Sequence, residues 1–113
     1  MIDDCLFCKL AAGDIPATIV RETDRLVAFR DIAPQARVHV LVIPRDHYAD
    51  IGALAAADPQ LAGELAAAAA AIAEAEGVGG GWRLVFNTGE DAGQTVFHVH
   101  GHVLGGGVLR GLA

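Results

Sequence analysis

The sequence predicts an α+β domain with a mostly antiparallel sheet of about five strands, one short N-terminal helix and one long helix. Most of the strand-forming runs follow one another across short turns instead of alternating with helices, which favours antiparallel pairing. Two stretches have helical periodicity, one at the start of the chain and one in its second half. The length of 113 residues suits one domain with its own core. We therefore expect residues 1–113 to form a single domain.

Both predicted helices carry an apolar stripe on one side. The first covers Cys5–Ala12. Asp58 and Pro59 open the second, because aspartate caps helix N-termini and proline is tolerated in the first turn. It is expected to run to about Glu76 and to stop at Gly77. The stripes consist of Leu6, Phe7 and Leu10 in the first helix, and of Leu61, Leu65, Ala68 and Ile72 in the second.

The predicted strands are short and rich in β-branched and aromatic residues. Apart from a final histidine-bearing strand, they are Thr18–Thr23, Arg25–Asp31, Ala36–His47 and Trp82–Asn87. The first two flank the turn-prone Asp24 and form a predicted hairpin. In the third, which Pro44 ends, side chains alternate between two faces: Val38, Val40 and Val42 on one, and His39, Leu41 and Ile43 on the other.

Composition excludes several classes of function. Eight basic against 14 acidic residues give a net charge of −6, which argues against a nucleic-acid partner. No apolar stretch approaches the roughly 20 residues that a membrane helix needs, so we expect a soluble protein with no membrane partner. The N-terminus, MIDDCLFCKL, opens with aspartates and has no signal-peptide pattern, so a cytoplasmic location is expected.

The segment QTVFHVHGHVLGG concentrates three of the five histidines at alternate positions. On one β-strand, His98, His100 and His102 would line a single face. A lone histidine is more often a buried, hydrogen-bonded core residue, but strict alternation of three favours chemistry. Either the three ligate a catalytic zinc ion, or one imidazole attacks an electrophile while its neighbours manage protons.

The loop before this segment, residues 88–95, favours a phosphorus electrophile. Gly89 and Gly93 allow close approach of the backbone, and Gln94 and Thr95 add polar side chains. Backbone and side-chain donors of this kind suit an anionic oxygen such as that of a phosphate. Nucleophilic attack by a histidine on phosphorus therefore fits the sequence better than attack on a carbonyl.

The heptad HVHGHVL, His98–Leu104, resembles the signature of the histidine-triad (HIT) superfamily of nucleotide hydrolases and transferases. Three further stretches extend the resemblance over nearly the whole chain: CLFCKLAAGDIPATIV, LVAFRDIAPQARVHVLVIPRDH and NTGEDAGQTVFHVHGHVLGG. Together they are similar to the Hint branch, whose members are purine nucleoside phosphoramidase-like. The resemblance implies a single HIT domain with a HIT-like fold, acting on a purine nucleotide substrate as a homodimer.

The resemblance also implies catalytic roles. His100 matches the nucleophile that attacks the α-phosphorus of a nucleoside monophosphate derivative, such as an AMP-amine phosphoramidate, to give a nucleotidyl-imidazole that water cleaves. His98 and His102 match flanking residues that contact phosphate oxygens or position the nucleophile, and His39 matches another active-site histidine. This chemistry requires no metal.

The implied nucleotide-binding residues fall into three groups. His100 and His102 would touch the phosphate, and Asp31 would bond the ribose hydroxyls. The apolar clamp around the purine would be Leu6, Phe7, Phe29 and Ile32, and the phosphate loop Asn87, Gly93, Gln94 and Thr95. Without the resemblance, Asp31 reads as an ordinary turn residue, and His39 as a buried core histidine.

Cys5 and Cys8 form a CxxC pair, which in a reducing compartment suggests metal binding or redox chemistry. With His47 and His98 they could complete a Cys2His2 set for a structural zinc ion. The resemblance to the Hint branch implies zinc at these positions in a subset of its members. The alternative is two half-buried cysteines without a metal. Zinc on His98 would remove that imidazole as a free acid or base.

Two other functions stay open from the sequence. One is a zinc-dependent hydrolase that uses the three histidines as metal ligands, although no carboxylate base lies on the same segment. The other is a nucleotide-binding or interaction module with only residual catalysis. Gly101, between His100 and His102, is expected to weaken the strand and to leave less packing behind the nucleophile.

Overall fold

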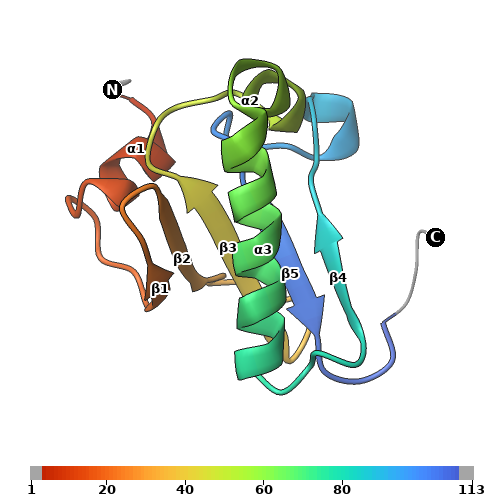
Figure 1. Cartoon of the computed structure of the whole chain (residues 1–113). Coiled ribbons are helices and arrows are strands. Elements are labelled where there is room, and N and C mark those ends of the chain that lie inside the picture. Colours follow the sequence, from red (N-terminus) through yellow and green to blue (C-terminus); the bar gives the residue numbers. More distant parts are fainter. Residues whose placement is uncertain (1–3, 110–113) are drawn as a thin grey trace.

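A computed structural model describes residues 4–109, and it contains one five-stranded sheet with three α-helices (Figure 1). The sheet order is β1-β2-β3-β5-β4, and every neighbouring pair is antiparallel. The elements are α1 (Leu6–Ala11), β1 (Ile19–Glu22), β2 (Leu26–Arg30), β3 (Val38–Pro44), α2 (Ile51–Ala57), α3 (Pro59–Ala75), β4 (Trp82–Val85), the 3-10 helix η1 (Glu90–Ala92) and β5 (Gly101–Gly105). The predicted α+β class with an antiparallel five-stranded sheet is confirmed.

Two predictions rest partly on residues outside the described range. The acidic start of the chain, on which the prediction of a cytoplasmic location depends, includes residues 1–3, and the predicted domain extends to residue 113. Among residues 4–109, no helix is both long enough and apolar enough to cross a membrane.

The long helix begins where its capping residues predict. The Asp58 carboxylate accepts a hydrogen bond from the Leu61 N–H at 3.0 Å, and Pro59 occupies the first turn. The buried stripe of α3 is Leu61, Leu65, Ala69, Ile72 and Ala73. Ala68 was predicted in this stripe and is only half-buried, because the buried face turns by one residue in the second half of the helix.

The seven-residue helix α2 was not predicted. Its N-cap is Asp50, whose carboxylate accepts a hydrogen bond from the Ala53 N–H at 2.8 Å. Only Leu54 is fully buried, so the segment has too few apolar positions to show a helical period. In Figure 1, α2 leads directly into α3 at one end of the sheet.

The sheet separates two cores, and β3 contributes to both. Val38, Val40 and Val42 pack on the side of α3, with β5 residue Val103 beside them. Leu41 packs on the opposite side in a smaller cluster with α1. The predicted alternation of β3 is therefore observed. Figure 1 shows α3 lying across one face of the sheet, over β3 and β5.

The histidine segment is only partly a strand, which corrects the prediction. β5 begins at Gly101, so His98 and His100 precede it. The reason is that the Val99 N–H donates to the Tyr48 carbonyl at 2.7 Å instead of to a neighbouring strand. Side chains nevertheless alternate, since Val99 lies in the α3 core while the histidines lie on the α1 side. β4 likewise ends earlier than predicted, at residue 85.

Gly101 does not leave the expected gap behind the nucleophile. A Cβ atom at this position would lie 3.0 Å from Leu84 Cδ1 and 3.1 Å from two atoms of the Phe86 ring. These side chains occupy the space that a larger residue would fill. The expectation of looser packing behind His100 is therefore wrong.

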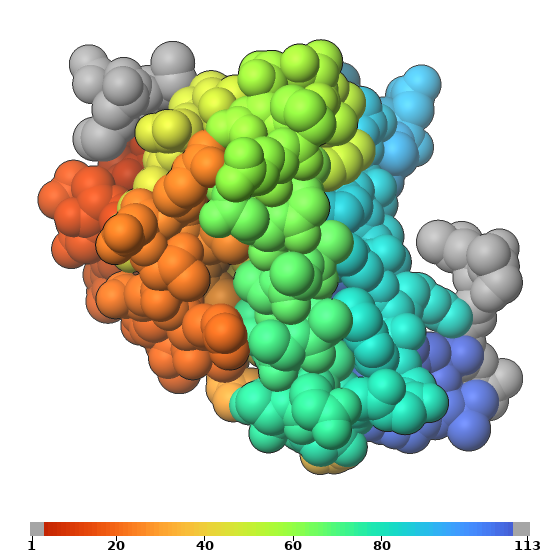
Figure 2. All heavy atoms as spheres, in the orientation of Figure 1, coloured from red at the N-terminus to blue at the C-terminus, as the bar shows by residue number. Residues whose placement is uncertain are grey.

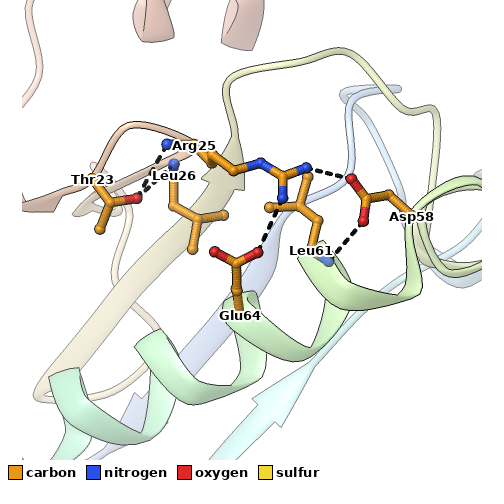
Figure 3. Close-up of polar contacts among 6 residues, drawn as sticks. All are labelled: Thr23, Arg25, Leu26, Asp58, Leu61 and Glu64. Atoms are coloured by element: carbon orange, nitrogen blue, oxygen red, sulfur yellow. Dashed lines mark hydrogen bonds and ion pairs between the residues drawn. The ribbon is translucent and has the colours of Figure 1, made fainter.

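Ion pairs fasten the β1–β2 hairpin to the start of α3 (Figure 3). The Arg25 guanidinium contacts the Asp58 carboxylate and also Glu64 Oε2 at 3.1 Å. Its backbone N–H donates to Thr23 Oγ1 at 3.3 Å. The Leu61 N–H and the Arg25 guanidinium together lower the pKa of Asp58. In the space-filling view the hairpin lies directly beside α3 (Figure 2).

Candidate functional site

A cavity of about 750 Å³ opens on the α1 side of the sheet. Its walls are mostly apolar and come from α1, from the loop that follows α1, and from β2 and β3. His100 and His102 are among its polar lining residues. The predicted site residues that line it are Leu6, Phe7, Phe29, Asp31, Ile32, Thr95, His100 and His102. A mostly apolar cavity with a few polar groups is typical of a small-molecule site.

Hydrogen bonding selects the tautomer of His100. Its Nδ1 lies 2.8 Å from the backbone oxygen of His98, and a carbonyl only accepts, so Nδ1 carries the proton. The lone pair of the neutral ring is therefore on Nε2. The Phe7 ring packs against the imidazole edge to face, with centroids 5.1 Å apart. The buried His100 ring is thus held by a donor bond on one side and an aromatic contact on the other.

A second chain of hydrogen bonds fixes His39 and His102. The Gln35 N–H donates to His39 Nδ1 at 3.0 Å, so His39 carries its proton on Nε2. This Nε2–H donates to His102 Nδ1 at 2.9 Å, which places the His102 proton on Nε2. Among the described residues, that buried nitrogen has no hydrogen-bond partner. An unpaired buried donor is costly and marks the place for a ligand acceptor.

The pKa values of these imidazoles favour their neutral forms. The pKa of His102 is lowered to about 4, mainly by burial and to a smaller extent by the neighbouring His100 and His39 rings. Burial also lowers the pKa of His39, although the carboxylate of Asp31 acts in the opposite direction. Both rings are therefore neutral at pH 7, as the tautomer assignment requires.

Asp31 lies at the edge of the cavity and takes part in a turn. Its Oδ1 accepts a hydrogen bond from the Ala33 N–H at 2.8 Å, and its Oδ2 lies 3.4 Å from His39 Nε2. Asp31, His39 and His102 could be a metal-binding group by distance. The tautomer of His39 argues against it, because Nε2 carries a proton and has no lone pair for a metal ion.

Only one residue of the predicted phosphate loop lines the cavity. Thr95 is exposed and lines the cavity, whereas Asn87, Gly93 and Gln94 are not among its lining residues. The buried Gln94 side chain accepts from the Gly89 N–H at 2.9 Å and donates to the backbone oxygens of residues 49 and 96 at 2.7 and 3.1 Å. Gln94 therefore holds the loop in shape instead of presenting its amide to a ligand.

The Cys/His cluster, Cys5, Cys8, His47 and His98, lies beside this cavity. Its four potential ligand atoms lie within 4.8 Å of one another. His98 Nδ1 is 3.4 Å from both cysteine sulfurs, and His47 Nδ1 is 3.4 Å from Cys8 Sγ. Zinc bond lengths in a tetrahedral geometry put a sulfur and a nitrogen ligand about 3.5 Å apart. The donor set and its spacing fit a structural zinc ion.

The hydrogen bonding of His98 agrees with this fit. The His98 Nε2–H donates to the Pro44 backbone oxygen at 2.8 Å, which leaves the Nδ1 lone pair directed at the sulfurs. Burial lowers the pKa of His98, which keeps its imidazole neutral as a metal ligand must be. Burial raises the pKa of the Cys5 thiol, which would release its proton on binding the ion. Neither nitrogen of His98 is free for proton transfer in the cavity. The three alternating histidines therefore do not converge on one metal ion, and they form no common ligand group.

Sequence reasoning missed several parts of the site. Gln35, whose backbone N–H sets the tautomer of His39, carries no sequence signal. The wall residues Leu10, Ile15 and Leu41 were not predicted as part of the site, although Leu41 alternates with His39 on β3 and so faces the same side.

The chain matches the HIT domain family over residues 12–108. It is 48% identical over 106 residues to an uncharacterized HIT-like protein of Synechococcus elongatus, with 94% of this chain and 93% of that protein covered. It is 41% identical over 107 residues to the purine nucleoside phosphoramidase of Escherichia coli, with coverages of 94% and 90%. The crystal structure of a HIT family hydrolase from Legionella pneumophila superposes with a TM-score of 0.91 at 46% identity, covering 95% of this chain and 96% of that one.

Proposed function

The chain belongs to the HIT domain family, and from that premise we propose that it hydrolyses purine nucleoside phosphoramidates, such as AMP-amines, through a nucleotidyl-His100 intermediate. The relatives support a hydrolase in the broader sense. The finer assignment is supported mainly by one observation: the Nδ1–H of His100 is bonded to the His98 carbonyl, so the Nε2 lone pair is the reactive one.

In the first step, the Nε2 lone pair of His100 attacks the α-phosphorus. The P–N bond to the leaving amine breaks, and the amine departs with that electron pair and takes up a proton from water. The imidazole gains charge, which the Nδ1–H bond to the His98 carbonyl helps to stabilise. In the second step water attacks phosphorus, the bond to His100 breaks with its electron pair returning to Nε2, and a proton is released.

His102 supplies a donor to the phosphate. Its Nε2–H is fixed by the hydrogen bonds that run from Gln35 through His39, and this donor has no partner in the described protein. A non-bridging phosphate oxygen would satisfy it. The transfer of a phosphoryl group depends mainly on positioning and on stabilising charge on these oxygens. Because its tautomer is already fixed, this neutral donor needs no proton transfer before it binds the phosphate.

The apolar end of the cavity would take the purine, between α1 and the end of β2. Phe7 and Phe29 form an edge-to-face pair there, with centroids 5.5 Å apart. Leu6 is 47% exposed, and Ile32 is fully exposed at the rim. A bound base would cover both of these side chains. Asp31 at the cavity edge would accept from the ribose hydroxyls.

The Cys/His cluster would hold zinc as a structural ion, outside the reacting groups. When bound, zinc would cross-link α1 to the histidine segment and to the loop after β3. No step of the reaction passes through it.

We also propose a homodimer in the cytoplasm. β4 is an edge strand of the sheet, and the outer face of α3 exposes the small residues Gly63, Ala66, Ala67 and Ala70. These features allow two copies to approach closely. Sedimentation velocity should give twice the mass of one chain, and a single-chain mass at all concentrations would reject the dimer.

The decisive test of the activity uses adenosine 5′-phosphoramidate. Wild type should release AMP with and without a chelator, and His100→Ala should lose turnover by at least about a thousandfold. Asp91→Asn, an exposed change in η1, is the control for handling and should match wild type. A chelator that abolishes the turnover of wild type, instead of reducing it by about tenfold, would favour a zinc hydrolase. Tight AMP binding without turnover would favour a binding module.

A further inference from the structure

The Cys/His cluster and the proposed nucleophile share a residue, His98. Its side chain faces the two cysteine sulfurs at 3.4 Å, whereas its backbone oxygen accepts the Nδ1–H of His100 at 2.8 Å. The His98 ring is fixed on its other nitrogen by Pro44. Any ligand on His98 Nδ1 therefore acts on the group that sets the tautomer and orientation of His100.

Phe7 makes a second connection between the two sites. It lies in α1 between the cluster residues Cys5 and Cys8, and its ring contacts the rings of both His98 and His100, with centroids 6.1 and 5.1 Å apart. It also forms a wall of the cavity. A six-residue helix has little stability of its own, so its position depends on what fastens it to the sheet.

We propose that metal occupancy of the Cys/His cluster positions the His100 imidazole and the Phe7 wall, so that the cluster regulates the nucleotide site from outside it. A metal ion joins α1 to His98 by replacing weak sulfur–imidazole contacts with coordinate bonds. The His98 carbonyl and the Phe7 ring then have fixed places, and together they enclose His100. The proposal rests on the proposed function only for the role of His100 as nucleophile.

The cluster is also accessible to a metal ion from outside the nucleotide cavity. A separate hollow of about 270 Å³ is lined by Cys8, His47, Asp46 and Arg45 and by two alanines of the α1 end. His47 is the half-buried ligand on this side: its Nδ1 lies 3.4 Å from Cys8 Sγ, and its ring contacts the His98 ring edge to face. Loading and removal of the ion can therefore occur without passing the nucleotide.

The test compares zinc-loaded and chelator-stripped protein by two readouts that need no turnover. Nitrogen-15 spectra of the histidine rings report tautomers, and calorimetry reports the affinity for AMP. In the loaded protein, His100 should show only the Nδ1–H tautomer. In the stripped protein, its signals should be the average of the Nδ1–H and Nε2–H tautomers. AMP should bind about tenfold more weakly to stripped protein, the lower end of what loss of support around a site costs. Added zinc should restore both.

His47→Gln provides the variant that removes a ligand without touching His100 or Phe7, and Asp91→Asn, an exposed change in η1 that lines neither cavity, is its control. With zinc present, His47→Gln should behave as stripped wild type, and Asp91→Asn as loaded wild type. The proposal is overturned if zinc raises the melting temperature while the His100 signals and the AMP affinity stay the same, or if the protein binds no zinc. If both readouts respond but no phosphoramidate is hydrolysed, the coupling stands and the proposed function fails.

Discussion

Acidification should destabilise the protein chiefly through His102. In the folded state its pKa is about 4, against 6.5 for an unperturbed histidine. As the pH falls through 6.5, the unfolded chain takes up a proton at this residue while the folded protein does not, so unfolding becomes more favourable. The loss of stability grows until the pH reaches about 4 and then stops.

Those two pKa values set the size of the effect. Between pH 7.5 and pH 5, the difference in proton uptake at His102 amounts to about 2 kcal/mol of unfolding free energy, and its full extent below pH 4 is about 3 kcal/mol. The lowered pKa of His39 acts in the same direction. The carboxylates with lowered pKa values, Asp58 and Glu76, titrate mainly below this interval.

The assay is urea unfolding of chelated protein at pH 7.5 and pH 5, for wild type and for His102→Asn. Asparagine keeps an acceptor near the position of Nδ1, so the His39 Nε2–H retains a partner while the titrating group is gone. The variant should lose about 2 kcal/mol less than wild type on acidification. Equal losses in the two proteins would refute the assignment of a buried, neutral His102.

Three further predictions address packing, capping and the cavity wall. Gly105→Ala should lower the unfolding free energy by about 1–3 kcal/mol, because the new Cβ would lie 2.8 Å from both Cβ and Cγ2 of Val78. Adding Val78→Ala, which removes Cγ2 but keeps Cβ, should recover part of this loss in urea titrations, and an additive double variant would contradict the clash. Asp58→Ala should lower the melting temperature by several degrees in calorimetry, and Asp58→Asn, which keeps the capping oxygen, by less; equal drops would argue against the cap. Phe7→Leu should weaken AMP binding several-fold in calorimetry through loss of the aromatic contacts, and unchanged affinity would exclude this ring from the base site.

The fold followed from local signals wherever these were strong. Asp58 and Pro59 marked the start of α3, and the alternation around His39 and Leu41 assigned the two faces of β3. The helix α2 was not predicted because a seven-residue helix with one buried side chain has almost no periodic pattern of apolar residues. The late start of β5 was not predictable, because the Val99 N–H bonds to a loop carbonyl brought close only by tertiary folding.

The sequence predicted which residues form the candidate site, but not the hydrogen bonds that connect them. Resemblance supplied the histidines and the cysteine pair. The hydrogen bonds that assign their tautomers depend on strand register, which pairs Leu41 with His102 and so brings His39 beside it. They also depend on backbone groups, such as the Gln35 N–H, whose position no side-chain pattern encodes.

The central claim is that phosphorus becomes bonded to His100. The most direct measurement is to mix wild type with adenosine 5′-phosphoramidate, quench in alkali within milliseconds, and map the peptides by mass spectrometry. We predict an adenylyl group on the peptide that carries His100, localised to that residue by fragmentation and absent from His100→Ala. Steady turnover with no adenylyl group on any histidine, or with the group on His98 or His102, would contradict the account.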